Sequence, residues 1–452
     1  MPKPFLLNRK LFFFLSILFV IHTQAQSSFQ FYGSNTKKQS VKFKLINNLI
    51  ILPLEINGKE LNFILDTGVN KTILFNLSQN DSIGLKNIET IALQGLGGGK
   101  PVDALLSKNN RFRIKNLISS NEELYVVLKD DFDLSGKMGI TIHGIIGHKL
   151  LKNVIIRINY KTKKIDFYNP KYYKYKKCKR CETFPLEFYR NKPYINVSAQ
   201  IDTLGNNITD LKMLIDSGGS DAMWLFENTK VEIKTPIKHF NDLLGEGLSG
   251  AIYGNRSKIP YIKIGRFVVK KPTVSFLDSI STFNARKFKE RNGSIGGTIL
   301  KRFKVIIDYP NKKISLKKNA SLKDGFYYNM SGLSVVFIGK KLIREEQETK
   351  VIGAYGTNNG SSSNNTLSLV TSYTYKFKPS YKVNNVVSGS PSAFAGIKKD
   401  DIILEINNKP VHNYTLDEIT SLFQKKPNRK IKMLVERKGL KLKFEFKLKE
   451  RI

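Results

Sequence analysis

Short runs of β-branched and aromatic residues, often alternating with polar ones, dominate the chain between residues 40 and 318. Such runs are typical of β-strands, because successive side chains face opposite sides of a sheet. Helical periodicity is confined there to short pieces, such as the segment HKLLKN after Gly147. The pattern therefore predicts a mainly β protein. The clearest strands are NLIILPLEI, NFIL and YVVL in the first half, and YINVSAQI, IPYIKI and VVKKPTVSF in the second.

The strand pattern contains an internal duplication with an offset of 150 residues. LNFILDTG, which ends at Gly68, reappears as LKMLIDSG, which ends at Gly218. Three further landmarks follow in the same order: a Gly-rich segment, an apolar segment with glycine, and a hairpin-like segment. They match residues 95–97 to 245–247, residues 144–147 to 294–297, and residues 154–168 to 305–316. Four landmarks in one order indicate two copies of one β-rich unit, over residues 40–170 and 184–318.

Each copy ends an apolar strand with an aspartate, a hydroxyl residue and a glycine. The residues are Asp66, Thr67 and Gly68 in the first copy, and Asp216, Ser217 and Gly218 in the second. Two such loops related by a pseudo-twofold axis would bring the two carboxylates face to face. Like charges a few ångströms apart cannot both ionise cheaply, so such a pair shares one proton. The repeat therefore predicts general acid–base hydrolysis of a peptide bond, with no metal and no other cofactor.

The doubled Asp-Thr/Ser-Gly frame resembles the two lobes of an aspartic protease. IIGHKLLKN, in particular, is similar to the motif after the flap of retropepsin-like proteases. The resemblance implies a bilobed double β-barrel, with a cleft for an extended peptide or protein substrate. It also implies that Thr67 and Ser217 lock the two loops together. The implied flap and substrate-binding residues are Gly95, Leu96, Gly97 and Gly98 in the first lobe, and Gly245 and Gly247 in the second.

The sequence departs from the pepsin-like pattern at two kinds of position. Ser or Thr usually follows the loop glycine, where this chain has Val69 and Gly219. The first flap also lacks the tyrosine of pepsin-like enzymes, although Tyr253 lies just past the second. A duplicated barrel whose aspartates only cap loops is therefore an alternative to the active protease. Such a chain would be a catalytically inactive, peptide-binding adaptor in the cell envelope.

The pattern changes after Leu316, where a smaller α+β module begins. Residues 326–339 predict a strand, and the polar stretch 357–366 predicts a mobile loop or linker. Thr415 to Glu418 form a capping box, which predicts a helix with an apolar face. That face consists of Leu416, Ile419, Leu422 and Phe423. The segment GSPSAFAGIKKDDIILEIN resembles the core of bacterial protease-associated PDZ domains, and the likeness extends over residues 326–448.

The PDZ resemblance also implies a binding site. In that family a Gly-apolar loop before a strand edge captures the C-terminus of a peptide by β-augmentation. Gly332 and Leu333 stand in the matching loop. The implied partner is the C-terminal tail of a substrate or of another protein. The alternative is a PDZ-shaped spacer without a ligand.

The first residues indicate where the protein works. Residues 1–10 are basic, residues 11–21 are apolar apart from Ser16, and the small residue Ala25 follows. This order is that of a secretory signal peptide, removed after about residue 25. We therefore expect an exported chain, located in the periplasm, in the cell envelope or outside the cell. An uncleaved signal anchor is the alternative, although the apolar run is only about half the length needed to span a bilayer.

The charge of the chain limits its partners. Its 452 residues include 75 Lys and Arg against 37 Asp and Glu, which gives a formal charge of +38. Such a charge first indicates a nucleic acid, an anionic surface or an acidic substrate. Export argues against nucleic acid and leaves an anionic envelope surface or acidic substrates. Because two lobes are fused in one chain, no dimer is needed to build the site.

Cys178 and Cys181 lie in a basic, tyrosine-rich connector between the two copies. Zinc would need two further ligands, and none stands nearby in the sequence. A thioredoxin-like role would need a strand-to-helix context that is missing, although neighbouring cations favour thiolates. In an exported chain, a local disulfide between the two cysteines is the plainer expectation.

Overall fold

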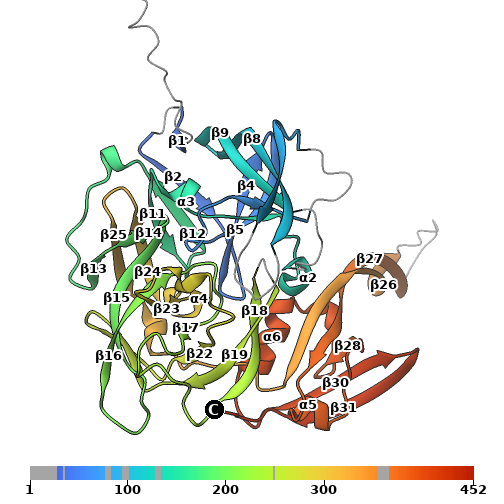
Figure 1. The fold of residues 1–452 in the computed structure, drawn as a ribbon. Coiled ribbons are helices and arrows are strands. Elements are labelled where there is room, and N and C mark those ends of the chain that lie inside the picture. Colours follow the sequence, from blue (N-terminus) through green and yellow to red (C-terminus); the bar gives the residue numbers. More distant parts are fainter. Residues whose placement is uncertain are drawn as a thin grey trace, which may run out of the picture.

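The structure is a computed structural model that describes residues 28–33, 36–76, 83–93, 101–127, 134–247, 250–353 and 366–452. These residues form two β-rich lobes, a sheet shared between the lobes, and a C-terminal module (Figure 1). The predicted leader at residues 1–25 lies outside the described residues. Within the described ranges, none of the helices has the length and apolar character that a membrane crossing requires.

The first copy of the repeat, lobe 1, folds into one sheet of nine strands, counted over its described residues. The strands are β1 (Gln30–Phe31), β3 (Lys44–Ile46), β4 (Leu49–Ile56), β5 (Lys59–Leu65), β6 (Ile73–Leu74), β7 (Ile88–Leu93), β8 (Val102–Ile114), β9 (Leu117–Val127) and β10 (Gly144–Ile146). Their order is β1-β9-β6-β10-β5-β4-β8-β7, and β3 pairs with β4. Because β8 also pairs with β9, the sheet closes into a barrel around the apolar side chains of β4 and β5.

The second copy, lobe 2, repeats this topology in a ten-stranded sheet, again counted over described residues. Its strands are β14 (Glu187–Tyr189), β15 (Lys192–Gln200), β16 (Ile208–Ile215), β17 (Met223–Phe226), β18 (Phe240–Gly247), β19 (Gly250–Lys258), β20 (Tyr261–Ile264), β21 (Phe267–Lys270), β22 (Thr273–Leu277) and β23 (Arg291–Ile295). The run β22-β17-β23-β16-β15-β20 corresponds to β9-β6-β10-β5-β4-β8 in lobe 1. The predicted duplication is therefore present in the strand order as well as in the motifs.

In both lobes, the strand that comes just before the aspartate pairs with a parallel neighbouring strand. Strand β5 pairs with β10, and β16 pairs with β23. The Asp66 N–H donates to Ile146 O, and the Asp216 N–H donates to Ile295 O. Ile146 thus corresponds to Ile295, so matching residues 144–147 to 294–297 is wrong by one residue. The error arises because Gly296 and Gly297 are adjacent, and the sequence pattern does not show which of them packs against the aspartate loop.

A short helix follows each of these parallel strands. Helix α3 (His148–Leu151) confirms the helical segment predicted after Gly147, and α4 (Gly297–Leu300) is its counterpart in lobe 2. A Cβ atom on Gly147 would lie 2.0 Å from Asp66 O, and one on Gly296 would lie 2.3 Å from Asp221 O. Glycine is therefore required at both positions by the close approach of the aspartate loop.

A six-stranded sheet, counted over described residues, joins the two lobes. It contains β2 (Lys38–Lys42), β11 (Ile155–Asn159), β12 (Lys164–Tyr168), β13 (Cys181–Pro185), β24 (Phe303–Asp308) and β25 (Lys313–Lys318). The predicted hairpins are confirmed as β11–β12 and β24–β25, and β11 pairs with β24 across the lobe boundary. The 3₁₀ helix η1 (Pro170–Tyr172) follows β12. The expected disulfide between Cys178 and Cys181 is present in the connector before β13.

The C-terminal module is a sheet with two short helices. Its strands are β26 (Leu333–Gly353), β27 (Thr366–Val386), β28 (Ile402–Ile406), β29 (Lys409–Pro410), β30 (Lys430–Arg437) and β31 (Leu440–Lys447). Its helices are α5 (Pro391–Phe394) and α6 (Leu416–Gln424), with the 3₁₀ helix η4 (Val411–Asn413) between β29 and α6. Of the other 3₁₀ helices, η2 (Ala285–Lys287) lies between β22 and β23 of lobe 2, and η3 (Ala320–Lys323) follows β25. The predicted capping box opens α6, and its apolar face is buried as expected. The module's core includes Ile419 and Phe423.

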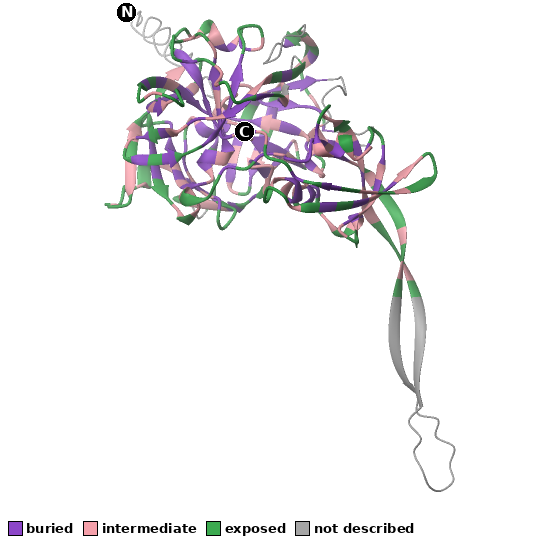
Figure 2. Cartoon of the chain, turned by 90° about the horizontal axis from the view of Figure 1, so that it is seen from below, coloured by how far each residue is buried: buried purple, intermediate pink, exposed green. Residues whose placement is uncertain are grey.

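One predicted strand of this module needs a correction. The strand predicted over residues 326–339 begins only at Leu333, because the preceding residues form a loop closed by the Asn329 side chain. It continues to Gly353, through residues for which the sequence predicted no element. Strands β26 and β27 continue as a paired ribbon that leaves the module (Figure 2). Residues 357–365 of the predicted polar linker lie outside the described residues, and Thr366 is the first residue of β27.

The glycine at the lobe 1 aspartate loop gives a direct test of this architecture. Gly147→Ala places a methyl group against the main chain of Asp66, so we expect a loss of about 3 kcal/mol in unfolding free energy, the upper end of the usual cost of overpacking. Gly245→Ala is the matched control, because a Cβ atom there meets nothing within 4 Å. Urea unfolding measures both. Equal stability of the two variants would contradict the packing described for Gly147.

Candidate active site

Thr67 and Ser217 join the two aspartate loops by reciprocal hydrogen bonds. The Thr67 N–H donates to Ser217 Oγ at 3.0 Å, and the Ser217 N–H donates to Thr67 Oγ1 at 3.0 Å. Each hydroxyl then donates to the opposite lobe, Thr67 Oγ1 to Ile215 O at 2.6 Å and Ser217 Oγ to Leu65 O at 2.7 Å. Both side chains are buried. The four bonds therefore form a closed ring, the loop lock, in which each hydroxyl both donates and accepts.

The loop lock holds the two carboxyl groups close together. A Cβ atom on Gly68 would lie 3.1 Å from Asp66 Oδ1 and 3.4 Å from Asp216 Oδ1, so the two carboxyl groups meet beside this glycine. Each also accepts a main-chain N–H from its own loop: Gly68 donates to Asp66 at 2.6 Å, and Gly218 donates to Asp216 at 3.1 Å. A Cβ atom on Gly218 would lie 2.2 Å from Asp66 Cγ. Only glycine at this position lets the carboxyl group of the other lobe approach so closely.

Burial and mutual repulsion shift the acidity of the pair. Burial, and then the charge of Asp216, raise the pKa of Asp66 to about 7 from its ordinary value of 3.8. Burial also raises the pKa of Asp216, while the positive charges of Arg291 and Lys192 oppose this rise. At neutral pH the pair therefore holds a proton that an isolated aspartate would have lost.

The residues after the loop glycines take over the supporting contacts in this chain. Val69 O accepts the N–H of His148 at 3.0 Å, which ties α3 to the Asp66 loop. The N–H of Gly219 donates to Asp216 O at 3.4 Å, and Gly219 O accepts the N–H of Gly297 at 2.7 Å. Main-chain groups thus support both loops at the positions where the sequence departs from the pepsin-like pattern.

Comparisons with known proteins agree with this geometry. Residues 52–150 match the aspartyl protease family model, and residues 382–437 match the PDZ domain model. The chain combines an aspartic protease architecture with a PDZ domain. The aspartyl protease match covers most of lobe 1, including Asp66, and the PDZ match runs from the end of β27 to the end of β30.

Individual relatives are distant or short. The probable protease eep of Enterococcus faecalis (strain ATCC 700802 / V583) is 34% identical over 58 residues, which is 13% of this chain and 13% of that protein. The crystal structure of an aspartic proteinase from Irpex lacteus superposes with a TM-score of 0.43 at 12% identity, over 64% of this chain and 99% of that one. The chain thus spans about an eighth of the curated relative that it matches.

Two cations beside the carboxyl pair were not found from the sequence. Arg291, the first residue of β23, is 3% exposed and packs its guanidinium 4.9 Å from the centre of the Phe226 ring. Its Nε donates to Gly293 O at 3.2 Å, and its charge acts more strongly on Asp216 than on Asp66. Lys192 opens the neighbouring strand β15 and interacts with both aspartates. Both cations stand among polar residues in the sequence, so no pattern marked them.

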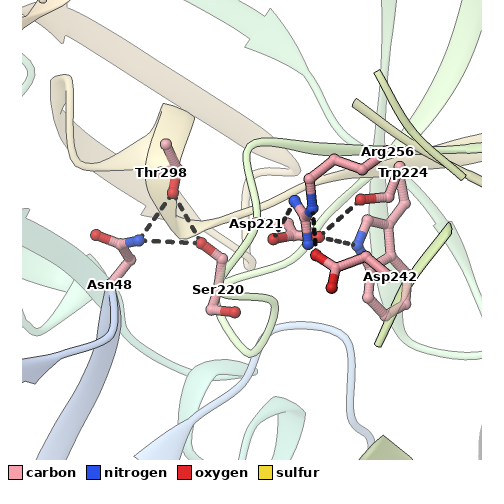
Figure 3. A network of polar contacts seen from close by, with 8 residues as sticks. Asn48, Ser220, Asp221, Trp224, Asp242, Arg256 and Thr298 are labelled. Atoms are coloured by element: carbon pink, nitrogen blue, oxygen red, sulfur yellow. Dashed lines mark hydrogen bonds and ion pairs between the residues drawn. The ribbon is translucent and has the colours of Figure 1, made fainter. Parts of the chain in front are cut away.

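The β18–β19 hairpin of lobe 2 is tied to the Asp216 loop by a buried arginine (Figure 3). Arg256 on β19 donates to Asp242 on β18 at 2.9 Å and to Asp221 at 3.1 Å. Asp221 also accepts from Trp224 Nε1 at 2.8 Å and from Ser275 Oγ at 2.9 Å. Because Asp221 follows Asp216 by five residues, the hairpin and the loop are held as one unit.

The structure places the remaining predicted residues as follows. Gly245 and Gly247 lie on β18, and Tyr253 on β19 is 54% exposed. Gly95, Leu96, Gly97 and Gly98 lie outside the described residues. Gly332 and Leu333 lie in the PDZ module, at the start of β26. Within the described residues, no group of three or more His, Cys, Asp or Glu side chains is arranged to hold a metal ion.

The loop lock predicts a large difference between two similar substitutions. Thr67→Val keeps the side-chain volume but leaves the Ser217 N–H and Ile215 O buried without a partner, so we expect a loss of about 2–4 kcal/mol in unfolding free energy. Thr67→Ser keeps the hydroxyl and should lose about 1 kcal/mol or less. Denaturant unfolding compares the two variants. If Thr67→Val proved as stable as Thr67→Ser, the lock would have no energetic role.

The carboxyl pair predicts a specific dependence of stability on pH. Because folding raises the pKa of Asp66 from 3.8 to about 7, the folded state binds the extra proton, and this contribution to stability is lost as the pH rises from about 4 through 7. Asp66→Asn removes that proton equilibrium. We therefore compare the unfolding free energy of the variant with that of the wild type at each pH. This difference should favour the variant more at pH 8 than at pH 4. A difference that stayed constant across this range would argue against the raised pKa.

Proposed function

We propose that this protein is an exported aspartic endopeptidase in which Asp66 and Asp216 activate water to hydrolyse peptide bonds. One observation carries the proposal: two half-buried carboxyl groups, one from each copy of the repeat, meet beside Gly68 and are held by the loop lock. A pair that only capped its own loops would need neither this mutual contact nor the shared proton. The aspartyl protease match over residues 52–150 supports the same reading.

The surrounding charges favour different roles for the two aspartates. Arg291 acts more strongly on Asp216, which favours the ionised form there, whereas the pKa of Asp66 is raised to about 7. Asp216 would therefore take a proton from water as the water oxygen bonds to the scissile carbonyl carbon. Asp66 would give its proton to the carbonyl oxygen. The resulting tetrahedral diol then breaks its C–N bond as the proton held by Asp216 passes to the leaving nitrogen. One diol hydroxyl returns its proton to Asp66, which leaves a carboxylic acid and an amine and restores the pair.

The substrate class follows from the hairpin and the charge of the chain. The β18–β19 hairpin carries exposed Tyr253 and is fixed to the Asp216 loop through Arg256. We infer that it covers an extended peptide, together with the Gly-rich segment predicted at residues 95–98. The formal charge of +38 favours acidic peptides or an anionic envelope surface as the setting. Export, which rests on the leader-like residues 1–25, belongs to the same proposal.

Cleavage of an unfolded protein library across pH 3–8 tests the proposal. Asp66→Asn should lower kcat by at least about 10³-fold, because one member of the acid–base pair is lost. Asp210→Asn, which removes an exposed carboxylate from the strand that ends just before Asp216, should leave activity unchanged. Equal activity of the wild type and Asp66→Asn would reject the proposal. Binding of peptides without turnover by the wild type would instead favour the inactive envelope adaptor.

The pH profile of the same assay carries a second expectation. Activity needs the protonated form of the pair, and that proton is lost as the pH rises through the pKa of about 7 at Asp66. We therefore expect kcat/KM to fall above about pH 7. A transition-state mimic with a tetrahedral hydroxyl group should inhibit the wild type. Activity that stayed flat up to pH 8 would contradict the assignment of Asp66 as the acid.

A further inference from the structure

One turn of lobe 1 touches all three parts of the chain. Asn47 and Asn48 connect β3 to β4 with φ values of 47° and 66°, as a two-residue hairpin turn requires. The Asn47 N–H donates to Asp417 Oδ1 at 3.1 Å, on helix α6 of the PDZ module. Asn48 Nδ2 donates to Ser220 O at 3.1 Å and to Thr298 Oγ1 at 2.8 Å, both in lobe 2 (Figure 3). This turn is therefore a three-way junction.

Lobe 1 also covers the docking edge of the PDZ module. Strand β26 is the outermost strand of its sheet within the described residues, and such an edge next to α6 is where the family adds a peptide strand. Helix α2 (Leu134–Met138) of lobe 1 lies against both β26 and α6. Gly139 follows it so closely that a Cβ atom there would lie 3.0 Å from Leu416 Cβ. The end of the edge near Leu416 is thus covered by the chain's own protease lobe.

At the other end of the edge, where a peptide carboxylate would bind, the main-chain N–H groups are hydrogen-bonded within the loop itself. Asn329 Oδ1 accepts the N–H of Ser331 at 3.0 Å and the N–H of Gly332 at 3.3 Å. Ser331 Oγ accepts the N–H of Leu333 at 3.0 Å, and Asn329 Nδ2 donates to Leu333 O at 2.6 Å. These three N–H groups are the donors that a carboxylate would need. A neutral amide oxygen and a hydroxyl already occupy them.

The PDZ module also packs against the β18–β19 hairpin of lobe 2. Phe240, the first residue of β18, packs in the PDZ core and lies 5.3 Å from the Tyr328 ring, centre to centre. The Arg451 guanidinium lies 3.8 Å from the centre of the Phe240 ring, and Lys258 on β19 donates to Glu450 and Ile452 O at 3.3 Å each. The last residues of the chain therefore bind the base of the hairpin that Arg256 connects to the Asp216 loop.

We propose that the docking edge of the PDZ module is built to hold the protease lobes of its own chain, and that the module does not read free C-terminal carboxylates. Its partner is then internal: the Asn47–Asn48 turn and α2 on one side, and the β18–β19 hairpin on the other. The module acts as a brace that fixes both lobes and the hairpin at a set separation. This inference does not depend on the endopeptidase activity.

Peptide binding to the full chain tests whether the loop at residues 329–333 recognises a C-terminal carboxylate. The probes are fluorescein-labelled random decapeptides with a free C-terminal carboxylate, compared with the same peptides ending in a carboxamide. We expect less than a twofold preference of the wild-type chain for the carboxylate. Asn329→Ala uncovers the N–H groups of Ser331 and Gly332, and should gain a preference of at least fivefold. A tenfold or greater preference of the wild-type chain for the carboxylate would overturn the proposal.

Amide hydrogen exchange of the full-length protein tests the brace without any peptide. Asp417→Ala removes the acceptor of the Asn47 N–H, whereas Asp417→Asn keeps an acceptor oxygen in the same place and is the matched control. We expect exchange at Asn47 to rise at least tenfold in Asp417→Ala and to change less than threefold in Asp417→Asn. Unchanged exchange at Asn47 in Asp417→Ala would show that the PDZ module does not hold this turn.

Discussion

The structure depends on a ring of four buried hydrogen bonds between the two aspartate loops. Thr67 and Ser217 each accept an N–H from the other loop and donate to a carbonyl of the other lobe. Without this ring, two carboxyl groups in a buried space would separate, because like charges repel strongly where water is excluded. The four hydrogen bonds join only neutral hydroxyl and main-chain groups. They can therefore hold the pair in place when the protonation of either carboxyl group changes.

The surroundings of the pair balance two opposing effects. Burial raises the pKa of both aspartates. The charge of Lys192 opposes this rise at both, and the charge of Arg291 opposes it at Asp216. A carboxyl pair with burial alone would tend to hold both protons, and a pair beside closer cations would tend to hold neither. Arg291 is kept buried by its contacts with the Phe226 and Tyr194 rings and with Gly293 O. The packing of β23 thus contributes directly to the electrostatics of the site.

A continuous set of contacts links the carboxyl pair to the C-terminal module. It runs from the Asp216 loop through Asp221 and Arg256 to the β18–β19 hairpin, and from Phe240 into the PDZ core. A second connection runs through the Asn47–Asn48 turn to Asp417. Spatial continuity by itself does not demonstrate energetic coupling. It does explain why the PDZ module packs on both lobes and is not suspended from a linker.

The sequence determined the duplicated β architecture, the two Asp-hydroxyl-Gly loops, the lobe-joining hairpins and the capped PDZ helix, because each depends on short-range periodicity or on a motif repeated in order. Tertiary structure alone decided that Gly296, and not Gly297, is the counterpart of Gly147 beside the aspartate loop. It also brought Arg291 beside Asp216 and placed the Asn329 amide over the loop at Gly332. These contacts join polar residues that local patterns treat as ordinary surface or turn positions. Only the packing of distant strands shows that they are buried and paired.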